Sequence, residues 1–276
     1  MSGEDPGQLA RAAARRELLE RRIEAIDEID VERIANFHRL FVVEGDLHGA
    51  EGRSVTGEGA GIIRIRNDIE RIERRRFIIA HEIGHCILHK SGSVKPCSQG
   101  DLFRYEEGNR EAEANWFASE LLMPAVLFRP HCDVAEPSFA AVKAVARVFR
   151  TTLTATCIRF VQLSAERCAL VWSESGRVKW CVRSADFPGW IERGRVLSGN
   201  SHAADVFSGR GLPIGFKPVP QMAWLDRHVL GGRSLMEETL AFDTLGAALS
   251  ILWFPVERDE DDRADDDNDD DPRWRR

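Results

Sequence analysis

The sequence lacks the long apolar runs that mark membrane proteins and secreted precursors. No apolar stretch reaches the ~18 residues that a membrane-spanning helix needs. The opening segment, MSGEDPGQLARAAARRELLE, has no apolar run after its charges, which argues against a secretory signal. We therefore predict a soluble, cytoplasmic protein with no membrane partner.

Paired cysteines and an excess of positive charge are also missing. The chain of 276 residues has six cysteines, none of them in a CxxC pair. In a chain of this length, such cysteines are typical of reduced thiols in the cytosol. The net charge of −7 argues against a broadly basic surface for nucleic acid. Part of that charge lies in residues 257–276, an acidic run that is predicted to be disordered because it cannot bury apolar surface.

Apolar residues are plentiful, at 43% of the chain, so a substantial core is expected. Helix formers with alternating charge predict one or two helices between Gln8 and Leu40. The β-branched run at Ile62–Ile65 predicts a strand. A helix is expected at about Ile72–His89. Another begins at the N-cap Asn109 and stops at Pro124.

The pattern changes after Pro137. Residues 138–163 predict two or three short helices with a Thr-rich turn at Thr151–Thr154. The remainder is β-rich, with a hairpin that turns at Glu174–Gly176 and a second pair of strands around Asp243–Gly246. Helices followed by strands predict an α+β fold.

One apolar helix carries polar groups on a single face. In RRRFIIAHEIGHCILHK, residues 74–90, His81, Glu82 and His85 form an HExxH pattern among isoleucines. The i, i+4 spacing stacks the two imidazoles so that both reach one cation at ~2.0–2.1 Å. Glu82 is placed to hold a water molecule without binding the metal itself. Gly84 is unfavourable in a helix by ~1 kcal/mol relative to Ala, which predicts a close approach by a strand or a substrate, or tight helix packing.

A third metal ligand is expected from another segment, since catalytic zinc usually has three protein ligands and an open position. His89 shares the face but lies roughly 12 Å along the axis from His81, so it is expected to support the site or the structure. The helix NREAEANWFASELLMP offers Glu111 as the ligand and Asn115, one turn on, as a hydrogen-bond partner of a ligating histidine. Glu113 is expected to point toward solvent.

The run RRFIIAHEIGHCILH followed by EAEANWFASELLMP resembles the ImmA/IrrE family of metallopeptidases. The resemblance implies a zincin-like peptidase domain in which His81, His85 and Glu111 bind zinc, with manganese as the alternative ion in the cell. It also implies that Glu82 is the general base and that Asn115 supports the site. The enzyme implied is a zinc-dependent metalloendopeptidase.

The order of the remaining segments resembles the IrrE (PprI) branch of that family. It implies an HExxH metallopeptidase domain at 1–128, a helix-turn-helix-like helical segment at 129–165, a β-rich GAF-like α/β domain at 166–256 and the acidic tail at 257–276. Family members cleave helix-turn-helix repressors of the XRE type. The resemblance therefore implies an XRE-family repressor as the substrate and induction of a stress or DNA-damage response.

Two regulatory roles compete with that interpretation. A DNA-binding regulator would contact phosphates through Lys143, Arg147, Arg150 and Arg159, near the Thr-rich turn. The following segment, LTATCIRFVQL, offers few side chains that read bases, so nucleic acid is the less favoured partner. A ligand-sensing regulator would have a vestigial peptidase site, and the complete set of motif residues argues against it.

The single tyrosine and the tryptophans of the C-terminal part each have two candidate roles. Tyr105, the single tyrosine, is a candidate donor to the oxyanion of peptide hydrolysis, against a structural role. Five tryptophans in the C-terminal part either line a ligand pocket or, as is commoner at these spacings, belong to the core. They are Trp172, Trp180, Trp190, Trp224 and Trp253.

Overall fold

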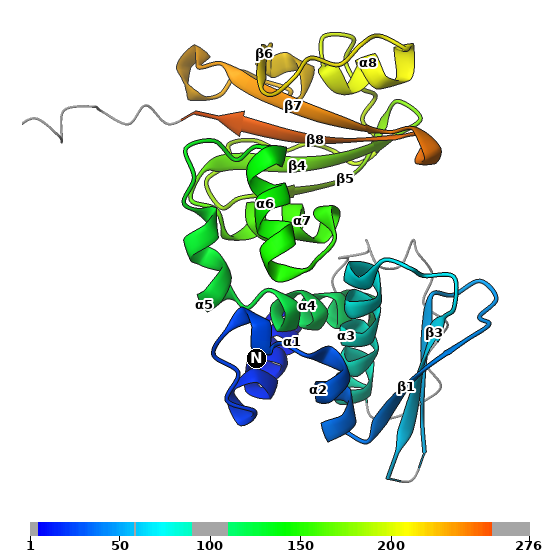
Figure 1. Ribbon diagram of the computed structural model, residues 1–276. Helices are drawn as coiled ribbons and strands as arrows, with labels where there is room; N and C mark the ends of the chain where they lie inside the picture. Colours follow the sequence, from blue (N-terminus) through cyan, green and yellow to red (C-terminus); the bar gives the residue numbers. More distant parts are fainter. Residues whose placement is uncertain (1–4, 58, 90–109, 256–276) are drawn as a thin grey trace, which may run out of the picture.

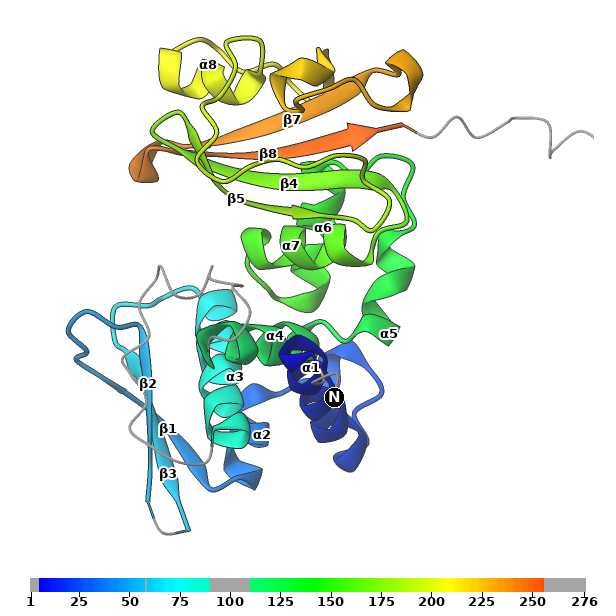
Figure 2. The same ribbon diagram turned by 180° about the vertical axis from the view of Figure 1, so that it is seen from behind.

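The computed structural model describes residues 5–57, 59–89 and 110–255 (Figure 1). The N-terminal half contains a three-stranded sheet and the C-terminal half a five-stranded sheet. Figures 1 and 2 both show helices α6 and α7 between the helices of the first half and the sheet of the second. The α+β fold predicted from the sequence is confirmed.

The chain begins with two helices that start at aspartate caps. Helix α1 (Pro6–Glu20) follows Asp5, and helix α2 (Val31–Phe37) follows Asp30; each aspartate side chain accepts a hydrogen bond from a backbone amide of the first turn. The 3-10 turn η1 (Ile26–Glu28) lies between them. Both helices fall within the segment predicted to be helical.

The small sheet has the strand order β1-β3-β2. Strand β1 (Leu40–Gly45) runs parallel to β3 (Gly61–Arg66), whereas β2 (Gly52–Thr56) runs antiparallel to it and forms an edge. The sequence predicts only β3. Strand β1 directly follows the segment predicted to be helical, and β2 has only one apolar residue, Val55, so neither carries a clear strand pattern.

One face of this sheet is buried against helix α3 (Ile72–Leu88). Ile63 and Ile65 of β3 are fully buried, while the alternating Ile62 points outward and is 45% exposed. Strand β2 approaches the helix closely at Gly52. Because of this close approach, the strand can contribute side chains to the polar face of α3.

Helix α4 (Arg110–Leu122) packs across α3. Gly84 of α3 faces Phe117 of α4, and a Cβ on Gly84 would lie 3.0 Å from Phe117 Cδ1. Of the three explanations for this glycine, the structure therefore supports tight helix packing. The chain leaves α4 at Pro124, as predicted, and enters the short helix α5 (Ala125–Phe128).

Two capped helices connect the halves. The 3-10 turn η3 (Arg129–Cys132) leads to α6 (Phe139–Phe149) and α7 (Leu153–Leu163), the helices predicted on either side of the Thr-rich turn. The hydroxyls of Ser138 and Thr152 cap their N-termini. Helix α7 packs against the first two strands of the following sheet.

The C-terminal sheet is antiparallel throughout, in the order β5-β4-β8-β7-β6. Both hairpins predicted from the sequence are present. The first turns at Ser175 and Gly176, which have positive φ angles of 49° and 71°, and the second turns through η6 (Asp243–Leu245). The strands are β4 (Arg167–Glu174), β5 (Arg177–Arg183), β6 (Lys217–Val219), β7 (Leu235–Phe242) and β8 (Ala247–Phe254).

Side chains of this sheet alternate between two cores. Leu170 and Trp172 of β4 join a core that extends through α7, α4 and α3 to α1. Ala169 and Val171 join a second core under helix α8 (His202–Ser208). The outer layer also contains the 3-10 turns η4 (Gln221–Ala223) and η5 (Leu230–Gly232).

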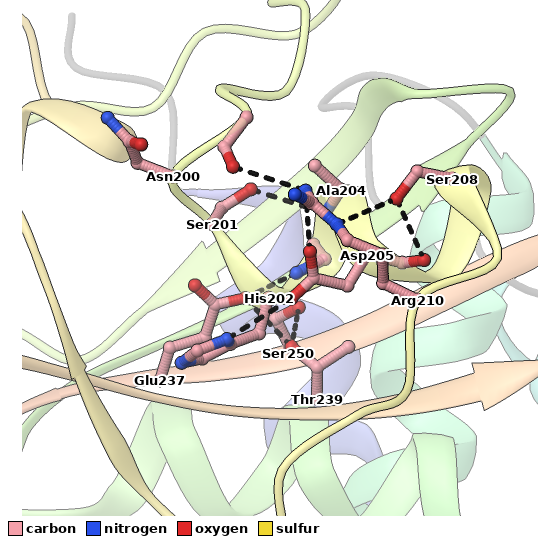
Figure 3. A network of polar contacts seen from close by, with 12 residues as sticks. Asn200, Ser201, His202, Ala204, Asp205, Ser208, Arg210, Glu237, Thr239 and Ser250 are labelled. Atoms are coloured by element: carbon pink, nitrogen blue, oxygen red, sulfur yellow. Dashed lines mark hydrogen bonds and ion pairs between the residues drawn. The ribbon is translucent and has the colours of Figure 1, made fainter.

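A buried carboxylate fixes this outer layer to the sheet (Figure 3). Glu237 of β7 is fully buried. It accepts hydrogen bonds from the Ala203 backbone amide at 2.7 Å and from Thr239 Oγ1 and Trp224 Nε1, each at 2.8 Å. Because Thr239 donates to Glu237, its oxygen accepts the 2.8 Å hydrogen bond from Ser250. These donors stabilise a charge that would otherwise be unfavourable in a core.

The cysteines behave as predicted in the described part of the chain, where all five are free. Burial raises the pKa of the Cys132 thiol to about 11 and that of Cys168 to about 12, so both are protonated near neutral pH. None of the described helices is long and apolar enough to cross a bilayer. Residues 91–101, whose Gly, Ser and Pro content predicts a loop, and the predicted disordered tail at 257–276 lie outside the described residues.

The proposed division of the chain stays a prediction. One core cluster contains residues from each of the first three proposed segments, from Ala10 of α1 through Phe160 of α7 to Trp253 of β8. The boundaries after residues 128 and 165 therefore cross continuous apolar packing.

Candidate metal centre

The HExxH helix presents its two histidines to a common space. Helix α3 is buried continuously from Arg76 to His85. His81 and His85 follow each other by one turn, with ring centroids 4.6 Å apart and Nε2 atoms 2.9 Å apart. Two ring nitrogens this close cannot both carry a proton between them, so at least one presents a lone pair to the shared space.

Helix α4 brings Glu111 to the same space. Its Oε2 lies 3.3 Å from His81 Nε2, and its Oε1 lies 3.4 Å from His85 Nε2. One ligand atom from each of the three side chains lies within 4.8 Å of the others. The histidine side chains are 1% exposed and the glutamate side chain 16%, so the carboxylate is the most exposed of the three candidate ligands.

The donor set suits one divalent ion. Two donors held ~2.0–2.1 Å from a tetrahedral ion lie roughly 3.3–3.4 Å apart. The three separations between these donors are 2.9, 3.3 and 3.4 Å. Two imidazoles and one carboxylate form a common zinc ligand set, and they leave a fourth position for water or substrate.

Asn115 fixes the orientation of one imidazole. It is fully buried on α4, one turn after Glu111, and its Oδ1 accepts a 2.9 Å hydrogen bond from His81 Nδ1. A proton on Nδ1 leaves the lone pair of His81 on Nε2, where it faces the other donors. The predicted hydrogen bond from Asn115 to a histidine of the motif is thus present, and its role in supporting a metal ligand stays a prediction.

Glu82 follows His81 on α3, and its side chain is fully buried. Its Oε2 accepts a 2.6 Å hydrogen bond from the hydroxyl of Ser54 on β2. Its Oε1 has no hydrogen-bond partner in the described part of the chain. Sequence reasoning misses Ser54 because it misses β2. The available signal is the pair Val55–Thr56, which is separated from the strand at Ile62 by a glycine-containing turn.

His89 is not one of the three donors, although its ring centroid lies 5.5 Å from that of His85. It is the C-terminal cap of α3, and its Nε2 lies 3.3 Å from the Arg110 carbonyl oxygen. Burial, followed by the nearby His85, lowers its pKa. Glu113 differs from its prediction: its carboxylate lies 3.7 Å from His89 Nε2 and is 25% exposed. The ends of α3 and α4 converge there, so Glu113 contacts its neighbour.

Two predicted residues lie outside the described part of the chain. They are the helix cap Asn109 and the candidate oxyanion donor Tyr105. Their predicted roles stay predictions.

The basic residues near the Thr-rich turn do not form one surface. Lys143, Arg147 and Arg150 are exposed. Arg159 is instead buried and donates to Glu120 Oε2 at 2.5 Å and to the Met123 carbonyl at 3.0 Å. No residue of α7 is exposed. A helix that reads DNA must place polar side chains in a groove, and the polar side chains of α7 are buried or half-buried.

The tryptophans belong to different parts of the C-terminal half. Trp224 is fully buried under α8, whereas Trp172 and Trp253 lie in the core on the other face of the sheet. Trp180 stacks on Trp172 with ring centroids 6.0 Å apart. Trp190 is 64% exposed. Residues on opposite faces of one sheet do not line a common pocket, which favours the core role for most of them.

Comparison with known proteins identifies a similar solved structure and a matching domain family. No curated protein matches the chain. A solved structure of a Mycobacterium tuberculosis transcriptional regulator is similar to it, with a TM-score of 0.56 and 16% identity over 88% of this chain and 87% of that chain. This likeness shows a shared fold. Residues 38–161 match the IrrE N-terminal-like domain, Peptidase_M78. The chain thus contains an IrrE N-terminal-like domain, which confirms its resemblance to the ImmA/IrrE family.

Proposed function

We propose that the protein is a zinc-dependent endopeptidase that cleaves an XRE-type helix-turn-helix repressor and thereby induces a stress or DNA-damage response. The observation that carries the proposal is the convergence of His81, His85 and Glu111, with the buried carboxylate of Glu82 next to His81 in the same helix. The peptidase family of the matching domain supports the chemistry. The similar structure is that of a transcriptional regulator, which supports a role in transcription.

Different residues of the site would have different roles in peptide hydrolysis. A bound zinc ion would supply a Lewis acid that polarises a carbonyl and lowers the pKa of a water molecule toward ~7. Glu82 Oε1, which has no partner in the described chain, would accept the proton of the attacking water and deliver it to the leaving amine. Asn115 would hold His81 in the ligating tautomer.

The proposal is tested with purified XRE-type repressors encoded in the same genome. Zinc-loaded protein is expected to cut one of them at a defined site. Glu82→Gln keeps the side-chain shape and the metal ligands but removes the base, so cleavage is expected to fall by at least ~10²-fold while zinc binding persists. Normal cleavage by this variant would contradict the assigned chemistry. An absence of cleavage by the wild-type protein would contradict the proposed substrate.

We also propose that residues 166–256 form a GAF-like domain that positions the repressor or binds an activating ligand. A five-stranded antiparallel sheet with helices on both faces supports this assignment. The chain would then divide into a peptidase domain, a helix-turn-helix-like segment and this domain.

A second candidate function is a DNA-binding or ligand-sensing transcriptional regulator with a vestigial peptidase site. The shared fold with a transcriptional regulator favours it. The buried α7 disfavours direct DNA reading. Less than one metal ion per chain after reconstitution, together with no cleavage, would favour this candidate. Gel shifts at several salt concentrations would detect DNA binding, because phosphate contacts weaken steeply as salt rises.

A further inference from the structure

We propose that Ser54 is the positioning residue for the general base: its hydroxyl holds one oxygen of Glu82 so that the other oxygen faces the attacking water. This inference rests on the proposed peptidase function. The observation behind it is the 2.6 Å hydrogen bond between Ser54 Oγ and Glu82 Oε2, with the two residues 4% and 0% exposed.

The fold places Ser54 there through strand pairing. Ser54 pairs with Ile63 of β3 and shares its buried face, which packs on α3. Two residues earlier, Gly52 lies so close to the helix that an added Cβ would meet Glu82 Oε1 at 3.2 Å. The strand therefore passes close to Glu82, and the hydroxyl that reaches the carboxylate belongs to Ser54.

The hydrogen bond distinguishes the two oxygens of the carboxylate. A free carboxylate can rotate about its last bond and exchange them. With Oε2 held by Ser54, the carboxylate plane is fixed and Oε1 remains as the acceptor without a partner in the described chain. A buried acceptor without a partner is unfavourable, so this geometry fits an oxygen that hydrogen-bonds a molecule supplied from outside.

The inference predicts a specific kinetic effect for Ser54→Ala. With a repressor that the wild-type protein cleaves, kcat should fall by about 10- to 100-fold, because small misplacements of a catalytic group reduce the rate by such factors. KM and zinc affinity should stay unchanged, since Ser54 binds neither substrate nor metal. Ser54→Thr restores a hydroxyl on a strand that accepts β-branched residues, so it should recover most of kcat.

Ser173→Ala is the matched control. Ser173 is a fully buried serine of β4 whose hydroxyl has no hydrogen-bond partner in the described chain, so this variant should retain wild-type kinetics. A kcat of Ser54→Ala equal to that of wild type would overturn the inference. Parallel losses of kcat and zinc affinity in Ser54→Ala, without recovery in Ser54→Thr, would assign Ser54 to packing and would also overturn it.

Crystal structures of the zinc-loaded wild-type and Ser54→Ala proteins separate this inference from the proposed function. The wild-type Glu82 carboxylate should have one orientation, and that of Ser54→Ala should be rotated or divided between orientations. If the wild-type protein cleaves no repressor, the proposed function fails while these structures still decide the role of Ser54. One identical orientation in both proteins would refute the positioning role.

Discussion

At the scale of single residues, Asn115 provides the clearest test of the metal centre. Its Oδ1 accepts from His81 Nδ1 at 2.9 Å, and both side chains are buried. In Asn115→Ala the ring loses the partner that fixes its tautomer and orientation. Zinc affinity should therefore fall by about 10- to 100-fold, as for other residues that support metal-bound histidines. Competition with a chromogenic chelator measures this change.

The matched control lies on the same helix. Glu113 contacts His89 at 3.7 Å and is outside the three-residue group, so Glu113→Gln should leave zinc affinity unchanged. If Asn115→Ala remained folded and bound zinc as tightly as wild type, the hydrogen bond would have no role in ligation.

Much of this site could be predicted because its spacing is local. His81, Glu82 and His85 lie on one helix, and Asn115 follows Glu111 by one turn, so a 3.6-residue period places each pair without tertiary information. Ser54 contacts Glu82 across 28 positions of sequence, through a strand that carries little signal. A contact of that kind depends on how β2 packs against α3, which no local pattern contains.

At the scale of elements, the contact between β2 and α3 determines whether the strand reaches the site. A Cβ on Gly52 would lie 2.4 Å from Ile78 Cγ2, so Gly52→Ala must push the strand away from the helix. We expect a loss of about 1–3 kcal/mol in the free energy of unfolding, as for other overpacked positions. Urea denaturation measures it. Ser54 moves with the strand, so cleavage should also decrease.

A double variant identifies the cause of that loss. Ile78→Ala removes the opposing Cγ2, so Gly52→Ala should be less destabilising in that background than in the wild-type protein. Gly57→Ala is the control in the same hairpin, because its added Cβ would have its nearest neighbour at 3.9 Å, an ordinary contact. Equal losses for Gly52→Ala in the two backgrounds would contradict the clash.

The strength of the local sequence pattern explains which helices and strands are predicted correctly. Helices α3, α4, α6 and α7 and the hairpins β4–β5 and β7–β8 carry strong periodicity or turn residues, and all are present. Strand β1, LFVVEG, is missed because it follows directly on a segment predicted to be helical as far as Leu40, and β2, GRSVT, is missed because it has a single apolar residue, Val55. Their order follows from tertiary packing: β1 pairs in parallel with β3, and the intervening β2 takes the opposite edge.

At the scale of the whole molecule, a buried ion pair joins helix α4 of the N-terminal half to the connecting helix α7. Glu120 lies on α4, the helix of Glu111 and Asn115, and Arg159 lies on α7 under the C-terminal sheet. Their side chains are 2% and 3% exposed. The guanidinium also donates to the Met123 carbonyl at 3.0 Å. Helix α4, which carries the proposed ligand Glu111, is thus bound directly to α7, which packs against the C-terminal sheet.

Removing the arginine alone should destabilise the protein strongly. Arg159→Ala leaves Glu120 buried without its main cationic partner, because Arg15 approaches only at 3.7 Å and is 55% exposed. We expect a loss of about 3–5 kcal/mol in the free energy of unfolding, the range for one broken partner of a buried pair. Arg147→Ala removes an exposed arginine of α6 and should change stability by less than ~0.5 kcal/mol. Tryptophan fluorescence during urea unfolding measures all variants.

The double variant Glu120→Leu with Arg159→Met tests whether stability and cleavage depend on the two charges or only on packing between α4 and α7. Apolar replacements of a buried ion pair are often neutral or stabilising, so this variant should recover most of the stability lost in Arg159→Ala. If it also recovers cleavage, packing between α4 and α7 suffices to hold Glu111 in place. If stability returns without cleavage, the directional hydrogen bonds of Arg159 position α4 for catalysis. Wild-type stability of Arg159→Ala itself would show that Glu120 is accommodated without the pair, and the joint between the halves would then depend on apolar packing alone.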